Sequence, residues 1–153
     1  MTDLEGYLKE QGVWHRFISK KETVHTSDAS AATGIDLHRI TKNLVSKTNK
    51  KEYVLLIVPG DRKVNLKDAA KALGVKNVRL MPFEEAESIS GYPPGGTPSI
   101  GHRTPMRAVV DSELTEFETL YCGGGSRDRL LEVRVEDVIR LNKAVVAPIS
   151  RAD

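Results

Sequence analysis

The chain has 153 residues, of which 39% are hydrophobic, and a formal net charge of +2 at pH 7. This length is typical of one domain with its own core, so residues 1–153 are expected to form a single domain. The first residues are charged and no apolar run reaches the roughly 20 residues of a membrane span, so neither a secretory leader nor a membrane association is expected. A single cysteine excludes an internal disulfide, and together these features predict a cytoplasmic protein.

Short helices and strands follow one another without a regular rhythm. In chain order, the patterns predict a helix at 3–11, a strand at 13–18, a helix at 26–34, a hairpin of strands at 40–47 and 52–59, a helix at 65–74, a strand at 75–81, a helix from 82 to 88, strands at 107–111, 119–122 and 130–135, and a helix at 136–142. The run 53–58 is apolar throughout, which predicts a central strand buried on both faces. The irregular order favours an α+β fold with a mixed, curved, barrel-like sheet flanked by short helices.

Helix boundaries are indicated by capping residues. Asn65 precedes the strongest apolar stripe and Gly74 follows it, as expected of an N-cap and a helix-ending glycine. For the helix at 26–34, Thr26 or Ser27 is the expected N-cap and Gly34 the terminating residue.

Two loops hold seven of the twelve glycines. The first reads Gly-Tyr-Pro-Pro-Gly-Gly-Thr-Pro-Ser-Ile-Gly over 91–101, and the second reads Cys-Gly-Gly-Gly-Ser-Arg over 122–127. Glycine allows close approach of the backbone to a ligand, and proline stiffens the intervening path. The loops therefore predict a pocket built from main-chain groups, the alternative being ordinary turns.

Metal and cofactor sites are not indicated. The four histidines (His15, His25, His38 and His102) lack the spacing of zinc ligands, and no dinucleotide-binding or Walker-type glycine motif is present. Cys122 could act as a nucleophile, although an isolated cysteine at the end of a strand is more often a small buried side chain.

Lys42 lies in a stretch where apolar and polar residues alternate. Local pattern favours a lysine that faces solvent from a half-buried strand. The functional alternative is an ammonium group directed into a pocket, where it would hold a carbonyl, hydroxyl or phosphate.

The run Lys42-Asn43-Leu44 and the two glycine loops occur in the order and at the spacing of the YbaK/prolyl-tRNA synthetase-associated editing domain family, which the chain resembles from about residue 4 to 148. Further matching positions are Gly34, Asp111, Phe117 and Tyr121. The resemblance implies a freestanding domain that hydrolyses mischarged aminoacyl-tRNA, with a barrel-like mixed sheet and no cofactor.

The resemblance also implies roles for individual residues. Catalysis is assigned to Lys42, Gly95, Gly96 and Gly101. Substrate binding is assigned to Asn43, Thr97, Pro98, Ser99, His102, Gly123, Gly124 and Gly125. The chain departs from the family in the order Thr97-Pro98-Ser99, where members read Gly-Gly-x-Ser-Pro-x-Gly. Branches that remove cysteine carry serine in place of Gly123 and aspartate in place of Leu130, so cysteine specificity is not implied.

The expected chemistry suits a backbone pocket, because an aminoacyl ester is already activated and needs only a placed water and support for the oxyanion. Arginines after the loops would contact the acceptor end of tRNA, or would form a solvated basic rim: Arg103, Arg107, Arg127 and Arg129. The sequence thus predicts a trans-acting deacylase that removes a small amino acid from tRNA-Pro or a similar tRNA, with an aminoacyl-tRNA synthetase as a further partner. A non-catalytic binding module and a hydrolase dependent on Cys122 are the alternatives.

Overall fold

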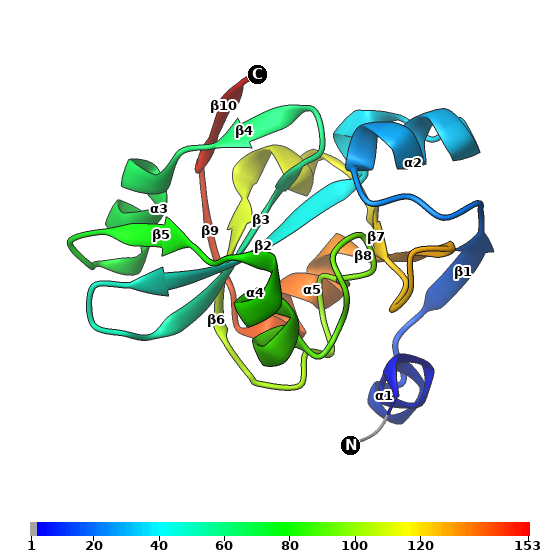
Figure 1. The fold of residues 1–153 in the computed structure, drawn as a ribbon, viewed down its shortest axis with the longest axis horizontal. Helices are drawn as coiled ribbons and strands as arrows, with labels where there is room; N and C mark the ends of the chain where they lie inside the picture. Colours follow the sequence, from blue (N-terminus) through cyan, green and yellow to red (C-terminus); the bar gives the residue numbers. More distant parts are fainter. Residues whose placement is uncertain (1–2) are drawn as a thin grey trace.

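The computed structural model describes residues 3–153 and shows helices packed around three β-sheets (Figure 1). Within this range the α-helices are α1 (Leu4–Gln11), α2 (Thr26–Thr33), α3 (Leu66–Leu73), α4 (Phe83–Ser90) and α5 (Val135–Asn142). The strands are β1 (His15–Ser19), β2 (Thr41–Thr48), β3 (Tyr53–Pro59), β4 (Arg62–Val64), β5 (Val78–Leu80), β6 (Arg107–Asp111), β7 (Thr119–Gly123), β8 (Arg129–Arg134), β9 (Val145–Ala147) and β10 (Ser150–Ala152). Two 3-10 helices, η1 (Leu37–Arg39) and η2 (Ser112–Glu116), complete the described elements.

The largest sheet has the strand order β5-β2-β3-β6-β9. Strands β2 and β3 form the expected antiparallel hairpin, whereas β3 pairs with β6, and β6 with β9, in parallel. Residues 54–58 of β3 are all buried, which confirms the prediction of a central strand covered on both faces.

A second, antiparallel sheet has the order β1-β8-β7 and stands beside the first. The two sheets meet at a parallel bridge between Ile40, just before β2, and Tyr121 of β7. One bridge does not close the strands into a barrel, so the expected α+β fold with a mixed, curved sheet is confirmed with the barrel left open.

Strands β4 and β10 form a separate antiparallel ribbon that the sequence patterns do not predict. Each has three residues, and Arg62 and Lys63 of β4 offer no apolar alternation. Strand β9 was missed for the same reason of length. Short strands of this kind depend on partners distant in sequence, which a local pattern does not reveal.

Capping explains where the helices begin and end. The Oδ1 of Asn65 accepts hydrogen bonds of 3.1 Å from the amides of Lys67 and Asp68, and Gly74 ends α3 with φ +71°, as predicted. The expected N-cap of α2 was wrong. His25 occupies that position without a side-chain cap, because the Thr26 hydroxyl donates instead to the Gly60 carbonyl at 3.4 Å.

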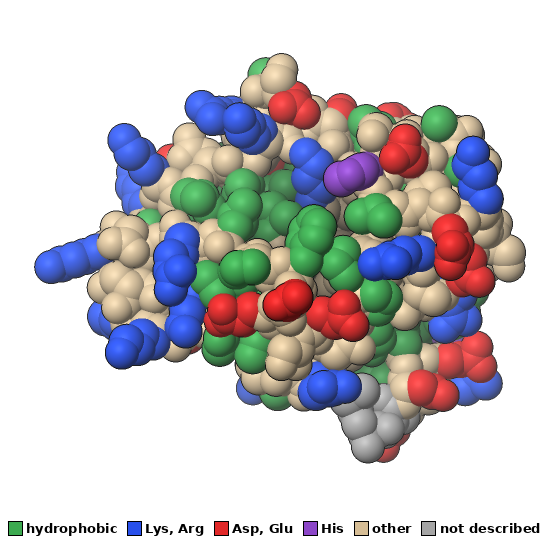
Figure 2. Space-filling view, in the orientation of Figure 1, with side chains coloured by type: hydrophobic (Ala, Val, Ile, Leu, Met, Phe, Trp, Pro, Cys, Tyr) green, Lys and Arg blue, Asp and Glu red, His purple; other side chains and the backbone are tan. Residues whose placement is uncertain are grey.

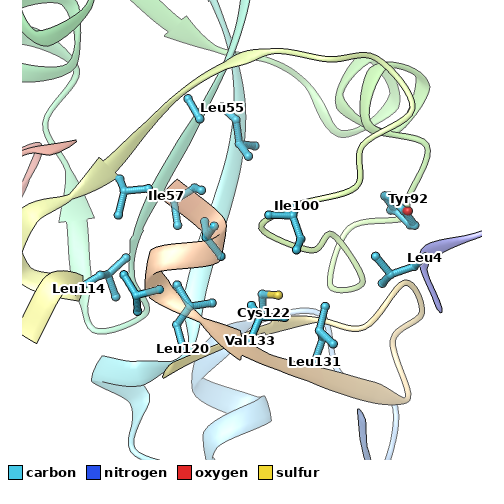
Figure 3. Packing of buried hydrophobic residues seen from close by; sticks show 14 of the residues in the cluster. Leu4, Leu55, Ile57, Tyr92, Ile100, Leu114, Leu120, Cys122, Leu131 and Val133 are labelled. Atoms are coloured by element: carbon cyan, nitrogen blue, oxygen red, sulfur yellow. The ribbon is translucent and has the colours of Figure 1, made fainter. Parts of the chain in front are cut away.

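The core lies on both faces of the central sheet. On one face β3 packs against α3, and on the other it packs against the second sheet and the first glycine loop. Figure 3 shows Ile100 of that loop directed into the core near Cys122, and both side chains are fully buried. The loop is therefore anchored by an apolar side chain, which limits its movement. No helix among residues 3–153 has the length and apolar character needed to cross a bilayer.

Candidate functional site

A cleft with a volume of about 590 Å³ lies between β2, the N-terminus of α2, α4 and the two glycine loops. Sequence-predicted residues that line it are Lys42, Asn43, Gly95, Thr97 and Gly123. Figure 2 shows apolar side chains gathered near the middle of one face, with Lys and Arg side chains above and at the sides of them and Asp and Glu side chains along their lower edge. The structure thus brings the lysine strand and both glycine loops together at one hollow.

The two glycine loops touch through their backbones. The amide of Gly125 donates a hydrogen bond of 2.9 Å to the carbonyl of Gly96. A Cβ on Gly123 would lie 2.4 Å from the carbonyl carbon of Gly96, and a Cβ on Gly95 would lie 2.6 Å from the carbonyl oxygen of Thr23. A side chain at Gly123 would push the two loops apart, and one at Gly95 would push the first loop away from the segment of Thr23, which explains glycine at both positions.

Asn43 fastens the first loop to β2. Its Nδ2 donates to the carbonyl of Thr97 at 3.2 Å and to the hydroxyl of Thr41 at 3.0 Å, and its Oδ1 accepts a hydrogen bond of 2.6 Å from the buried Ser99 hydroxyl. The amide group is engaged on both sides. Asn43 therefore lines the cleft with a side chain that already holds the loop in place.

Lys42 is half-buried in the cleft wall. Its Nζ donates a hydrogen bond of 2.8 Å to the main-chain carbonyl of Arg62 in β4. An ammonium group has three N–H donors, so two remain for a ligand. The carbonyl fixes the position of the positive charge without neutralising it.

Other predicted residues support the first loop from the side that faces away from the cleft. The Gly101 carbonyl accepts a hydrogen bond of 2.7 Å from the Tyr92 hydroxyl, and a Cβ on Gly101 would meet α1 rather than the cleft. The Nε2 atom of His102 lies 2.7 Å from the carbonyl oxygen of Pro98. Burial lowers the pKa of His102 to about 4, so its ring is neutral at pH 7 and Nε2–H is the donor. Predicted residues that do not line the cleft are Gly96, Pro98, Ser99, Gly101, His102, Gly124 and Gly125.

The four predicted arginines are dispersed. Arg107 forms a two-point ion pair with Glu52, with N–O distances of 2.9 and 3.1 Å. Arg129 donates to the Gly124 carbonyl at 2.7 Å and stacks on Phe17. Arg127 donates to the carbonyl of Pro94, a residue of the cleft wall, and Arg103 is exposed beside the first loop.

Sequence reasoning missed the apolar mouth of the cleft. Phe83, at the start of α4, is 65% exposed, and Leu80 and Val24 are 44% and 40% exposed. A large apolar side chain that stays in water beside a hollow is a sign of a binding surface. The sequence gives no clear signal for it, because Phe83 has the i, i+3 spacing to Ala86 that is typical of a residue facing the core.

Reactive side chains are scarce at this site. Cys122 is fully buried beside Ser99, and burial raises the pKa of its thiol to about 11, so the thiolate is rare at neutral pH. Within residues 3–153, no group of three or more His, Cys, Asp or Glu side chains is placed to hold a metal ion. The polar groups that the cleft offers are main-chain amides, hydroxyls, Lys42, His25 and three carboxylates at its wall, those of Asp61, Glu87 and Asp153.

The chain is similar in sequence to known proteins that contain an aminoacyl-tRNA editing domain. A family model described as an aminoacyl-tRNA editing domain matches residues 20–141. EbsC of Enterococcus faecalis, a proposed Cys-tRNA(Pro)/Cys-tRNA(Cys) deacylase, is 26% identical over 89% of this chain and 83% of its own length. A proline–tRNA ligase of Cupriavidus necator is 31% identical over 62% of this chain, which corresponds to 17% of the ligase.

Solved structures agree with this relationship. The hypothetical protein APE2540 superimposes with a TM-score of 0.89 at 29% identity, over 97% of this chain and 99% of the other. The crystal structure of a proposed trans-editing enzyme for prolyl-tRNA synthetase superimposes with a TM-score of 0.85 at 26% identity, over 97% and 95% of the two chains. Since the family model covers most of the chain, including both glycine loops, the chain belongs to the aminoacyl-tRNA editing domain family.

Proposed function

We propose that this protein is a trans-acting deacylase, which hydrolyses the ester of a mischarged tRNA that carries a small amino acid, on tRNA-Pro or a similar tRNA. Membership of the editing family and the names of its relatives support this function. The observation that carries the proposal is the single cleft shared by Lys42, Gly95 and Gly123. Its volume of about 590 Å³ suits a nucleoside with an aminoacyl group, and the remainder of a tRNA would lie outside.

Hydrolysis needs water to add to the ester carbonyl and the ribose oxygen to leave with a proton. Gly95 and Thr97 line the cleft, and their amides donate no hydrogen bond to residues 3–153. These amides support the oxyanion that forms when water adds. Main-chain donors of this kind contribute about 10²–10³ in rate each.

Lys42 supplies the positive charge of the site. Its fixed ammonium holds the terminal ribose or its phosphate and lowers the cost of the negative charge that develops. A covalent nucleophile is unnecessary because the ester is already activated. The buried, protonated thiol of Cys122 disfavours the alternative of a cysteine-dependent hydrolase.

The floor of the cleft indicates the kind of amino acid accepted. Gly123 of β7 and Leu130 of β8 are paired across the second sheet and both line the cleft, together with Ala29 of α2. These residues offer no charged group. A small, uncharged side chain fits this wall, and a larger one meets the stiff first loop.

Phe83 provides a surface for the terminal base. Its ring is exposed at the mouth of the cleft, where it has no other aromatic neighbour among the ring pairs formed by residues 3–153. Stacking of a base on an aromatic side chain contributes about 1–3 kcal/mol. Adenine stacked on Phe83 would direct the ester toward Lys42.

A panel of charged tRNAs tests the function. Purified protein is mixed with alanyl-, seryl-, cysteinyl- and threonyl-tRNA, prepared on tRNA-Pro and on the cognate tRNAs, and ester loss is followed over time. Release of a small amino acid from tRNA-Pro well above the rate without protein is expected. Binding of the charged tRNAs without any hydrolysis would refute the deacylase and leave the non-catalytic module.

A further inference from the structure

A second hollow continues from the cleft along β4 and the start of α3. It has a volume of about 710 Å³ and shares Lys42, Leu44 and Leu80 with the cleft. We call it the basic groove, because the other charged residues that line it are Lys63, Lys67 and Arg151. None of them was selected by the sequence patterns.

The charges of the basic groove are not compensated by the protein. Among the ion pairs formed by residues 3–153, none includes Lys42, Lys63, Lys67 or Arg151. No acidic residue lines the groove, whereas Asp61, Glu87 and Asp153 line the adjoining cleft. The groove therefore has a surplus of positive charge directly beside the proposed reaction site.

The strand register makes this charge costly. In the β4–β10 ribbon, Lys63 and Arg151 are direct cross-strand partners. Directly opposed residues of an antiparallel pair have Cβ atoms about 5 Å apart on the same face, where like charges are destabilising. The neighbouring Arg62 differs, since its guanidinium is bound to Ser150 and lies 3.5 Å from Glu113. Two opposed, exposed cations without a counter-charge from the protein form a surface that attracts the anionic groups of a ligand.

We propose that the basic groove binds the phosphates of the single-stranded 3′ end of tRNA, on the 5′ side of the terminal adenosine. The inference rests on the proposed function, which places that adenosine in the cleft. Lys42 stands where the two hollows meet, so one extended strand can enter the groove and end beside the glycine loops. Lys63 and Arg151 contact successive phosphates, and Lys67 extends the path along α3.

The basic groove also explains why the ribbon retains its unfavourable pair. Successive phosphates placed against Lys63 and Arg151 offset the repulsion of this pair with two attractive contacts. Without RNA the pair lowers stability, and with RNA it holds the strand in register.

The groove is tested by measuring the binding of an RNA hairpin that carries no amino acid and ends in the single-stranded sequence ACCA at its 3′ end. The reference RNA is the same hairpin without that single-stranded extension. The double variant Lys63→Gln/Arg151→Gln is compared with Lys76→Gln/Lys143→Gln, which removes two exposed lysines that line neither hollow. The groove variant should weaken binding of the extended hairpin roughly tenfold and reduce the slope of log Kd against log salt by about 1.4, since each single-strand phosphate contact contributes about 0.7. Its thermal midpoint should rise because the like-charge pair is gone.

Three results would overturn the proposal. These are wild-type affinity of the groove variant for the extended hairpin, an equal loss for the hairpin without the extension, or an equal loss in the control variant. Because the RNA carries no aminoacyl ester, the binding assay is independent of hydrolysis. A wild-type protein that binds the extension but hydrolyses no ester would refute the deacylase and leave the groove standing.

Discussion

The hydroxyl of Ser99 donates a hydrogen bond of 2.6 Å to the Oδ1 of Asn43. This contact joins a fully buried residue of the first glycine loop to the strand that carries Lys42. The first loop is therefore held against the backbone of β2 by side chains that need not touch substrate themselves, while the Arg62 carbonyl holds the Lys42 ammonium group.

Replacement of Asn43 by alanine should loosen the loop. The carbonyl of Thr97 would lose its donor, and an unpartnered, partly buried polar group costs about 1–3 kcal/mol. We expect a lower free energy of unfolding in urea and a reduced kcat for deacylation. In the matched control Asn49→Ala, which removes an amide that accepts from Lys76 and Asn77 far from the cleft, stability should fall while kcat is kept. Equal kcat in the two variants would contradict this positioning role.

Replacement of Gly123 by alanine should separate the two loops. Its new Cβ would be placed 2.4 Å from the Gly96 carbonyl carbon, and overpacking of this kind costs about 1–3 kcal/mol. The control is Gly12→Ala, which has φ +65° and open space around the Cβ, so it strains the backbone alone. Both variants should unfold at lower temperature, but only Gly123→Ala should lose deacylation. An active Gly123→Ala enzyme would show that the loop contact is dispensable.

Replacement of Phe83 by alanine should raise KM for charged tRNA. The ring is 65% exposed, so its loss hardly affects the core, whereas a stacked base would lose about 1–3 kcal/mol of binding. Phe83→Trp should restore the wild-type KM because it keeps an aromatic face. Trp14→Ala removes another exposed aromatic residue, outside the cleft, and should change nothing in the kinetics. The stacking role is wrong if Phe83→Ala and Trp14→Ala have the same KM.

His102 should make the fold sensitive to acid. Its pKa is lowered from 6.5 to about 4, so between these values the unfolded chain binds a proton that the folded protein does not. The contribution of neutral His102 to the free energy of unfolding is therefore fully present above its unfolded pKa of 6.5. This contribution is lost as the pH falls toward 4, by about 2 kcal/mol between pH 7 and pH 5. Urea unfolding at these two pH values measures the decline, and His102→Gln should show a smaller one. Identical pH dependence in both proteins would exclude His102 as its source.

Much of the fold follows from local patterns, whereas the site follows only in part. Helix α3 was predictable because Asn65 and Gly74 bound a single apolar stripe, and β3 because its run is apolar throughout. The ribbon of β4 and β10 was not, because Lys63 pairs with a residue 88 positions later and neither strand has an apolar pattern. The predicted α2 cap failed because the Thr26 hydroxyl has a partner in another part of the chain.

At the site, too, some residues were predictable from the sequence and others are revealed only by the structure. The glycine loops were predictable from their composition. Lys42 and Asn43 were predictable from their positions in the resemblance to the editing domain family. Of the arginines close to the loops in sequence, Arg107 is paired with Glu52, and Arg127 and Arg129 donate to carbonyls of the loops themselves. The uncompensated cations of the basic groove come instead from four segments that only the tertiary structure brings together.

Single-turnover hydrolysis of a mischarged tRNA by Lys42→Ala tests the central claim most directly, with Cys122→Ala measured beside it. If the ammonium group and the glycine backbone carry the reaction, Lys42→Ala should be slower by about 10²–10³ at saturating protein while keeping its thermal midpoint. Cys122→Ala should keep the wild-type rate, since its thiol is buried and protonated. A Lys42→Ala protein that hydrolyses the ester at the wild-type rate would contradict the proposal.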